Sequence, residues 1–525
     1  MTTRKERNAA PAQPAGNEAG IDPAALQRAL QLQRTGQLAE SEALCRRLLA
    51  ADPENIGAAV LAAQLSARRG DVEAGIDLLQ AALRRQPDAA PALNGLAALS
   101  LRLRRLPEAE AACRRLLAID PDNAVAHFNL GQVADAAGRS ADALASYRRA
   151  MAINPELAAI RLPLAVALHK LELAEEAMDT YRRVTTGGPD QALALFNLGT
   201  LHEARGELAE AATAYEAAIA IVPQETAPRL QYANVLYKLD RFGEAADAYG
   251  DLLRRQPAMT EAHGNLAKAL WAQGDASGAL AACDAGLRSR PGDTAILAFK
   301  AVMLRESGNP GGARALVDHE RFLKPVRIGP PPEFADVTAF NAALSAFVLQ
   351  HPTLVHEARN HATKDGKHTG DLLLGPKGPI AALERIVGDA VSQYLRELPA
   401  DAAHPFVANR PQHWKTSIWA VVMEGQGYQV PHIHPQAWLS GVYYARVPAF
   451  MAVAADQGGW IEFGMPLPEF GCKTPPEVRL VRPEEGLMLL FPAYFHHRTL
   501  PFQSTETRIS LAFDVMTQGP VSRTG

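Results

Sequence analysis

The chain has 525 residues, of which 48% are hydrophobic, so it is long enough for several domains with sizeable cores. Its 53 Lys and Arg residues against 57 Asp and Glu residues give a formal net charge of −4, which excludes a strongly basic nucleic-acid-binding protein and an acidic tail protein. With only four cysteines, a disulfide framework is not expected. The sequence contains no run of 18 apolar residues, so we expect no membrane-spanning helix. We therefore expect a cytoplasmic protein with no nucleic-acid or membrane partner.

The two parts of the chain differ in residue type. Residues 1–21 lack the apolar segment of a secretory signal, and we interpret them as a disordered lead-in. The first 325 residues are rich in Ala, Leu and Arg, whereas ten of the 15 histidines and four of the five tryptophans follow residue 326. The sequence therefore predicts two architectures joined in one chain.

A 34-residue period runs through the first part. Prolines recur at positions 53, 87, 121, 155, 189, 223, 257, 291 and 325. A small residue precedes each proline by twelve positions, as Ala109 precedes Pro121, and another precedes it by twenty-four, as Ala97 does. Glycines follow the same period at 36, 70, 138, 206, 274 and 308. Small residues let two antiparallel helices approach closely, glycine opens the turn, and proline ends the second helix.

This pattern resembles the tetratricopeptide repeat (TPR), with nine helix hairpins over residues 22–327. Because one hairpin cannot bury its apolar face alone, neighbouring hairpins are expected to stack into an all-α solenoid. The resemblance implies a concave surface that binds a protein or peptide partner. Cys45, Cys113 and Cys283 share one repeat position, which indicates a buried site in the second helix of each hairpin.

After the period ends, the sequence predicts a β domain with flanking helices. Residues 328–336 are proline-rich and indicate a stiff linker between the repeats and residues 337–525. Helices are expected at 337–350 and 380–397, with a loop and a short strand between them. Short strands rich in β-branched and aromatic residues follow at 414–423, 440–447, 459–463, 486–491 and 508–515. They favour an antiparallel sandwich or jelly roll, so the chain as a whole is of the α+β multidomain class.

Two histidines and a distal partner form the strongest chemical signal. His432 and His434 are separated by one residue, and on a strand residues i and i+2 face the same side. Both imidazoles can therefore reach one metal ion. A third candidate follows the strand at 486–491, in the pair His496-His497, although the sequence does not fix which of the two points inward.

The last predicted strand carries a candidate carboxylate clamp. Ile509, Leu511, Phe513 and Val515 alternate with the polar residues, so Arg508 and Ser510 face the opposite side. An arginine donates charge-assisted hydrogen bonds to a carboxylate, and serine adds a hydroxyl donor. The two side chains together suit an anionic ligand.

The segments HIHPQAWLSGVYY, FPAYFHHRTLP and RISLAF resemble the 2-oxoglutarate/Fe(II) oxygenase family often found behind TPR arrays, over about residues 330–520. The resemblance implies a double-stranded β-helix (jelly roll) and a non-haem iron dioxygenase that uses Fe(II), 2-oxoglutarate and O₂ to hydroxylate a C–H bond. His432 falls on the first metal ligand and His497 on the distal one. Arg508, Ser510 and Tyr444 fall on residues that hold 2-oxoglutarate. The TPR array would then recruit a protein or peptide substrate.

One ligand position departs from the family. The usual metal triad has two histidines and one carboxylate, but here the carboxylate position is His434. Either His434 is the third ligand, or a carboxylate such as Glu462 replaces it. A cupin-like metalloenzyme independent of 2-oxoglutarate is one alternative function, and a TPR scaffold with a silent β domain is another.

The remaining candidates have simpler interpretations. We expect His496 to be a solvent-exposed neighbour of His497. The other histidines without a partner pattern are expected in loops or on the surface: His361, His368, His404 and His413. We expect the tryptophans of this region to pack in the core.

Overall fold

The computed structural model describes residues 24–185, 187–356, 362–452 and 457–518. The predicted lead-in at 1–21 lies outside these residues. The chain divides into two compact units between Pro228 and Arg229, and each unit is described by itself. Within the described ranges, we find no helix with both the length and the apolar character needed to cross a lipid bilayer.

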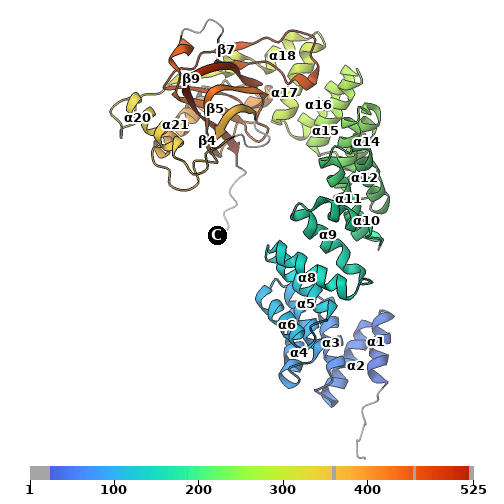
Figure 1. Cartoon of the computed structure of the whole chain (residues 1–525). Helices are drawn as coiled ribbons and strands as arrows, with labels where there is room; N and C mark the ends of the chain where they lie inside the picture. Colours follow the sequence, from blue (N-terminus) through green and yellow to red (C-terminus); the bar gives the residue numbers. More distant parts are fainter. Residues whose placement is uncertain (1–23, 186, 357–361, 453–456, 519–525) are drawn as a thin grey trace, which may run out of the picture. The chain divides into compact units, whose positions relative to one another are not determined.

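The first unit consists of helices that follow one another in antiparallel pairs (Figure 1). Their bounds are α1 (Ala25–Arg34), α2 (Leu38–Ala51), α3 (Ile56–Arg68), α4 (Val72–Arg85), α5 (Ala90–Arg102), α6 (Leu106–Ile119), α7 (Ala124–Ala136), α8 (Ser140–Ile153), α9 (Arg161–Lys170), α10 (Ala174–Arg182), α11 (Gly188–Ala204) and α12 (Leu208–Ile221).

The glycines and cysteines of the 34-residue period have the roles that the sequence predicts, whereas Pro325 does not end a helix but lies in a β-strand (Lys324–Arg327). Gly36 and Gly138 lie between paired helices with φ of 81° and 76°, a backbone region that favours glycine. A Cβ at Gly131 would lie 2.5 Å from Cε1 of Tyr147, so only glycine lets α7 and α8 pack this closely. The three cysteines that share a repeat position are buried in the second helices, as predicted.

The second unit begins with further helix pairs and continues into the β domain. Its helices are α13 (Thr226–Lys238, which begins just before the division), α14 (Phe242–Arg255), α15 (Thr260–Ala272), α16 (Ala276–Ser289), α17 (Thr294–Glu306), α18 (Pro310–Leu316), α19 (His319–Phe322), α20 (Val337–Leu349), α21 (Ile380–Glu397) and α22 (Pro405–Ala408). Helices α20 and α21 confirm the two helices predicted for this region.

The strands of the second unit form one antiparallel sheet in the order β1-β8-β5-β9-β4-β3-β2, with β6 paired to β9 and β7 paired to β6. Their bounds are β1 (Lys324–Arg327), β2 (Val355–His356), β3 (Thr363–His368), β4 (Trp414–His432), β5 (Leu439–Arg446), β6 (Ile461–Phe463), β7 (Arg479–Val481), β8 (Leu487–Pro492) and β9 (His497–Thr517). The α+β class with an all-α repeat region and an antiparallel β domain is therefore confirmed, while the finer jelly-roll assignment stays a prediction.

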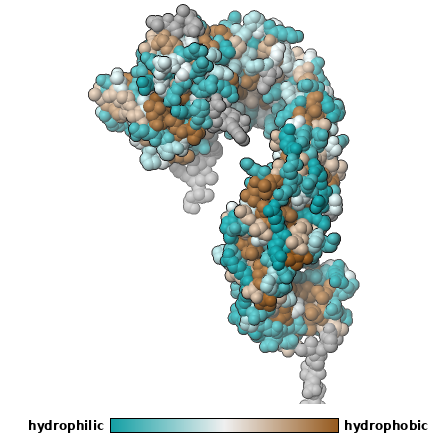
Figure 2. Space-filling view, in the orientation of Figure 1, coloured by the Kyte–Doolittle hydropathy of each residue, from teal (hydrophilic) through white to brown (hydrophobic). Residues whose placement is uncertain are grey.

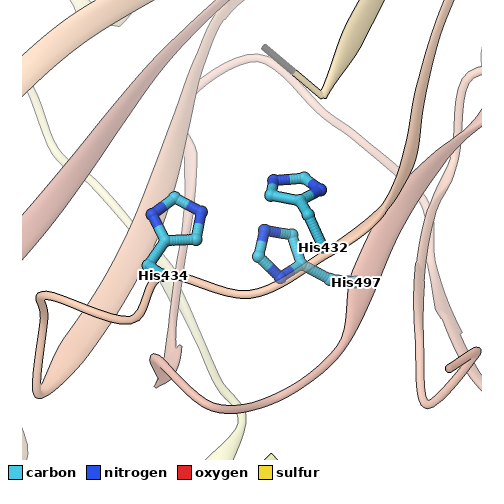
Figure 3. A group of neighbouring side chains, drawn as sticks. All are labelled: His432, His434 and His497. Carbon is cyan, nitrogen blue, oxygen red and sulfur yellow. The ribbon is translucent and has the colours of Figure 1, made fainter. Parts of the chain in front are cut away.

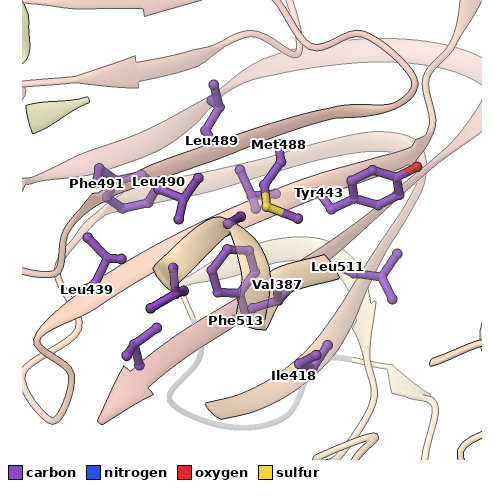
Figure 4. Close-up of a cluster of buried hydrophobic side chains, with 14 of the residues drawn as sticks. Val387, Ile418, Leu439, Tyr443, Met488, Leu489, Leu490, Phe491, Leu511 and Phe513 are labelled. Atoms are coloured by element: carbon purple, nitrogen blue, oxygen red, sulfur yellow. The ribbon is translucent and has the colours of Figure 1, made fainter. Parts of the chain in front are cut away.

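The alternation of side chains separates a core face from a cavity face. Ile418 of β4 and Leu511 and Phe513 of β9 pack with Val387 of α21 and with β8 in the main core (Figure 4). The intervening residues of the same strands point to the other face of the sheet, where they line a cavity. The predicted phase thus holds over residues 508–515 of β9.

The last helix pair, α17 and α18, packs against the β domain. Leu297 of α17 and Leu316 of α18 belong to the same hydrophobic core as the sheet. The hydroxyl of Thr294, at the start of α17, donates to the carbonyl oxygen of Pro435 at 2.8 Å. At the other end of α17, the carboxylate of Glu306 accepts hydrogen bonds from the backbone N–H groups of Lys473 and Thr474.

The proline-rich segment lies against the same domain. Residues 324–327, at the end of the range assigned to the repeats, form β1 and pair with β8. The N–H of Ile328 donates to Gly486 O at 3.0 Å, and the ring of Phe334 contacts that of Phe340 with centroids 5.0 Å apart. The division of the chain at 328–336 stays a prediction.

Candidate metal centre

Two of the three candidate metal ligands lie at the ends of paired strands, and the third lies in the connection between β4 and β5. His432, the last residue of β4, pairs with His497, the first residue of β9. The expectation that His434 shares a strand with His432 is wrong, because β4 ends at His432 and His434 lies just before a turn. Pro435 disfavours regular continuation of the chain there, and the N–H of His434 donates to Ala493 O at 3.0 Å instead.

This turn still brings the three imidazoles together (Figure 3). One nitrogen from each of His432, His434 and His497 lies within 4.8 Å of the other two, a spacing suited to a shared metal ion. The ring centroids of His432 and His497 are 4.2 Å apart, and that of His434 is 5.3 Å and 5.1 Å from theirs.

Each ring is oriented by a hydrogen bond at Nδ1. His432 Nδ1 lies 2.9 Å from Val430 O, and His497 Nδ1 lies 3.0 Å from Phe495 O. His434 Nδ1 lies 2.9 Å from a carboxylate oxygen of Asp514. Metal-binding histidines generally engage their second nitrogen in this way, which leaves Nε2 for the metal.

The surroundings keep the imidazoles available as ligands. Burial lowers the pKa of His432 to about 4, with the neighbouring His434 acting in the same direction. Burial also lowers the pKa of His497 well below its usual value. Both rings are therefore neutral at neutral pH, the state in which an imidazole binds metal. Nε2 of His434 is buried without a hydrogen-bond partner among the described residues. This donor set fits a divalent transition metal, for which imidazole is a suitable ligand.

A buried arginine lies in the same cavity as the histidines. Arg508 is 2% exposed, and among the described residues it has no carboxylate partner. Its Nη1 donates to Ser510 Oγ at 3.2 Å, and its guanidinium carbon lies 5.2 Å from the ring centroid of Tyr444. Arg508 Nε and the Tyr444 hydroxyl are both buried, and neither has a hydrogen-bond partner in the part of the chain that the structure describes. Burial lowers the pKa of Arg508, because the charged form is poorly solvated there.

The cavity that contains these groups has a volume of about 480 Å³. The three histidines, Tyr444, Arg508 and Ser510 all line it, so the structure brings these six predicted site residues together in one cavity. An unpaired buried cation is costly, and an anion that enters this cavity would relieve that cost.

Glu462, the alternative third ligand, is engaged elsewhere. Register in the sheet pairs it with Arg498, whereas the adjacent Phe463 pairs with His497. Its carboxylate accepts hydrogen bonds from Nε and Nη2 of Arg498 at 2.7 and 3.3 Å. Because neighbouring residues of a strand face opposite sides, Glu462 points away from the histidine cluster.

Two of the simpler expectations for histidines are wrong. His496 is 7% exposed and lines a second cavity, so it is not a solvent-exposed neighbour. His368 lies in β3, is buried and lines the same cavity as the three candidate ligands. His404 lies in a loop, as expected, but it is buried, and its Nε2 lies 3.0 Å from Ala315 O. His413 is exposed as expected, and His361 lies outside the described residues. These burials arise from helices and loops packing on the sheet, which spacing does not encode.

Sequence reasoning missed the carboxylate that orients His434. Asp514 also accepts a hydrogen bond from Ser440 Oγ at 2.6 Å, which fixes its orientation. The signal was present, because Asp514 shares the strand phase of Arg508 and Ser510. Trp419 was also misassigned to the core. Its ring stacks against that of His434 at 5.8 Å and lines the cavity, whereas Trp438 is buried as expected.

Comparison with protein-family models divides the chain in the same way. Models of the tetratricopeptide repeat match residues 26–84, 60–124, 161–226 and 230–294, and a further one matches 124–157. The model described as "Putative 2OG-Fe(II) oxygenase" matches residues 417–514. The chain therefore carries TPR repeats over 26–294 and a domain of that oxygenase family at 417–514.

Solved structures similar to the chain include several TPR proteins. YrrB, described as a TPR protein with an unusual peptide-binding site, is 18% identical and covers 36% of this chain and 98% of its own, with a TM-score of 0.34. PilF of Pseudomonas aeruginosa is 19% identical and covers 41% of this chain and 96% of its own, with a TM-score of 0.37. A comparison with curated proteins gave no match.

Proposed function

We propose that the C-terminal domain is a 2-oxoglutarate- and Fe(II)-dependent dioxygenase that hydroxylates a protein or peptide recruited by the TPR repeats. The observation that carries this proposal is a buried, unpaired arginine in the same cavity as three convergent imidazoles. A metal-binding cluster alone would suit many metalloproteins. The combination with an anion anchor suits a site that binds a metal together with a carboxylate-bearing co-substrate.

His432, His434 and His497 would hold the iron, which when bound supplies the redox chemistry that couples O₂ and 2-oxoglutarate to hydroxylation. Asp514 accepts a hydrogen bond from His434 Nδ1, which would leave Nε2 of that ring for the metal. The backbone carbonyls of Val430 and Phe495 do the same for the other two rings.

Arg508, Ser510 and Tyr444 would bind the far carboxylate of 2-oxoglutarate. Arg508 supplies the charge, and Ser510 holds its Nη1 in position. Burial raises the pKa of Tyr444 to about 12, although the charge of Arg508 acts in the opposite direction. The hydroxyl therefore keeps its proton at neutral pH and can donate it in a hydrogen bond. Val421 and Phe491 also line the cavity and add apolar surface to it.

The substrate would approach over the part of the cavity lined by Trp419. This side chain is only partly buried and stacks on His434, so its remaining surface is available to a bound residue. Recruitment is assigned to the repeats. On the face shown in Figure 2, hydrophobic residues are interspersed with hydrophilic ones along the solenoid. Large apolar side chains such as Ile119 (45% exposed) and Leu193 (47% exposed) offer contacts to a peptide.

Succinate formation and co-substrate binding test this proposal. The full chain is loaded anaerobically with Fe(II), 2-oxoglutarate binding is measured by calorimetry, and succinate is measured after O₂ is admitted. We expect Arg508→Ala to abolish 2-oxoglutarate binding while metal binding stays intact. A wild-type protein that binds iron but neither binds 2-oxoglutarate nor forms succinate would contradict the proposal.

The donor set favours one second candidate. Three imidazoles with no carboxylate ligand also occur in metalloenzymes that do not use 2-oxoglutarate, and the alternative is a cupin-like or catalytically silent metal domain behind a TPR scaffold. This candidate leaves the buried Arg508 without a role. Metal binding that is indifferent to 2-oxoglutarate would favour it.

A further inference from the structure

A second, smaller cavity lies between the last helix pair and the β domain. Its volume is about 70 Å³, and residues of α17, α18, α19 and the loops around His496 line it. Four nitrogen atoms of its lining residues are buried without a hydrogen-bond partner among the described residues: Nε and Nη2 of Arg305, Nε2 of His319 and Nε2 of His496. Buried polar groups are almost always paired, so a cluster of unpaired ones requires an explanation.

Arg305 lines this cavity, and its carboxylate-binding edge has no hydrogen-bond partner among the described residues. Nε and Nη2 are the two nitrogens with which an arginine grips two oxygens of one anion side by side. Elsewhere in the chain the same edge is occupied, since Arg498 uses Nε and Nη2 on Glu462, and Arg241 uses them on Glu244.

The carboxylates around Arg305 do not occupy this edge. A carboxylate oxygen of Glu306 lies 3.7 Å from Arg305 Nε, within ion-pair distance but beyond hydrogen-bond distance. That carboxylate is held by the backbone N–H groups of Lys473 and Thr474. Glu477, which also lines the cavity, is exposed and pairs with Arg314 at 2.7 Å.

The two imidazoles complete a polar lining on the side of the β domain. His496 is 7% exposed, and its ring is held edge-on against Phe470 at 5.9 Å. The ring of His319 packs edge-on against Phe495 at 5.3 Å. Aromatic packing fixes both rings, and an Nε2 that carries the ring proton can donate a hydrogen bond into the cavity.

We propose that this cavity binds a small inorganic oxyanion, phosphate or sulfate, held by the Nε/Nη2 edge of Arg305 and by Nε2 of His319 and His496. The oxyanion joins α17 to α19 and to the start of β9, so it stabilises the packing of the last helix pair against the β domain. This site is separate from the Arg508 cavity and does not depend on the proposed enzymatic function.

Phosphate binding to the metal-free full chain tests the site. Phosphate is titrated at constant ionic strength, balanced with chloride, and both the heat of binding and the thermal unfolding midpoint are measured. We expect saturable binding that raises the midpoint. Arg305→Gln removes the two charge-assisted hydrogen bonds from Nε and Nη2 and should weaken phosphate binding about tenfold or more. His319→Gln removes one neutral donor and should weaken phosphate binding less.

Two control variants separate the possible outcomes. Arg327→Gln changes an exposed arginine outside the cavity and should bind phosphate as wild type does. Arg508→Ala should also retain binding, since that arginine lines the other cavity. Absence of saturable binding would mean that the cavity holds water only, and the proposal fails. Loss of binding in Arg508→Ala with retention in Arg305→Gln would also overturn it. If Arg305→Gln does not fold by circular dichroism, His319→Gln decides.

Discussion

Replacing Arg508 with methionine should improve the stability of the ligand-free protein while abolishing co-substrate binding. The guanidinium is 2% exposed and lacks a carboxylate partner among the described residues, and burying a charge in that state costs several kcal/mol. The hydrogen bond to Ser510 and the contact with the Tyr444 ring together offset about 2 kcal/mol of this cost. Methionine has a similar length and packs beside Met423, so we expect the free energy of unfolding to rise by about 1–3 kcal/mol.

The same substitution should weaken 2-oxoglutarate binding strongly. Removing one partner of a buried charge pair costs about 3–5 kcal/mol, which corresponds to a loss of about a hundredfold or more in affinity. The assay combines urea unfolding of the metal-free full chain with calorimetric titration of 2-oxoglutarate. Four of the five tryptophans follow residue 326, so fluorescence mainly reports the C-terminal part of the chain.

Arg498→Met provides the matched control. Arg498 holds the buried carboxylate of Glu462, so its loss leaves that charge unpaired and should lower the free energy of unfolding by about 2 kcal/mol or more. If Arg508→Met lowered stability as much as Arg498→Met does, Arg508 would be a structural residue. Retained 2-oxoglutarate affinity in Arg508→Met would refute the assignment of the anchor.

Three further predictions concern the histidine cluster and the core. Asp514→Asn should weaken metal binding about 10–100-fold, because the orientation of His434 is lost; unchanged metal affinity in a chelator competition would contradict this. The folded-state pKa of His432 is lowered to about 4, so on acidification the unfolded chain binds the proton before the folded protein does. The metal-free protein should therefore lose stability as the pH falls from about 6.5 to 4, by at most about 1.4 kcal/mol per pH unit for this group. A free energy of urea unfolding that does not change over this pH range would refute the prediction. Gly441→Ala should destabilise the domain by about 1–3 kcal/mol, since the new Cβ would lie 2.2 Å from Cζ of Phe513 and 2.6 Å from a backbone oxygen, and a thermal midpoint equal to wild type would contradict it.

Local periodicity accounts for most of what the sequence predicts correctly. The 34-residue step, the two helices at 337–350 and 380–397, and the alternation in β9 depend on neighbours along the chain, so composition and spacing are sufficient. The phase of β9 also separates Leu511, on the core face, from Arg508, on the cavity face.

The errors share a different cause. His434 leaves the strand because β4 ends at His432, and it is oriented by Asp514 from eighty positions away. His496 is buried because α17 and α19 pack over it. Such contacts join elements that are distant along the chain, and the register shifts of the β4–β9 pair near Gly425 and Gln429 are not encoded in a short sequence window.

The attachment of α17 to the β domain limits how evolution or protein engineering can exchange the parts of this chain. A cut at residue 328 would remove Leu316 from the core and leave the Tyr494 hydroxyl without its acceptor. It would also remove the hydrogen bond from Thr294 to Pro435, which follows His434. Recombination that supplies a new array of repeats therefore has to retain α17 and α18 with the sheet. The transferable module is therefore larger than its family match at 417–514.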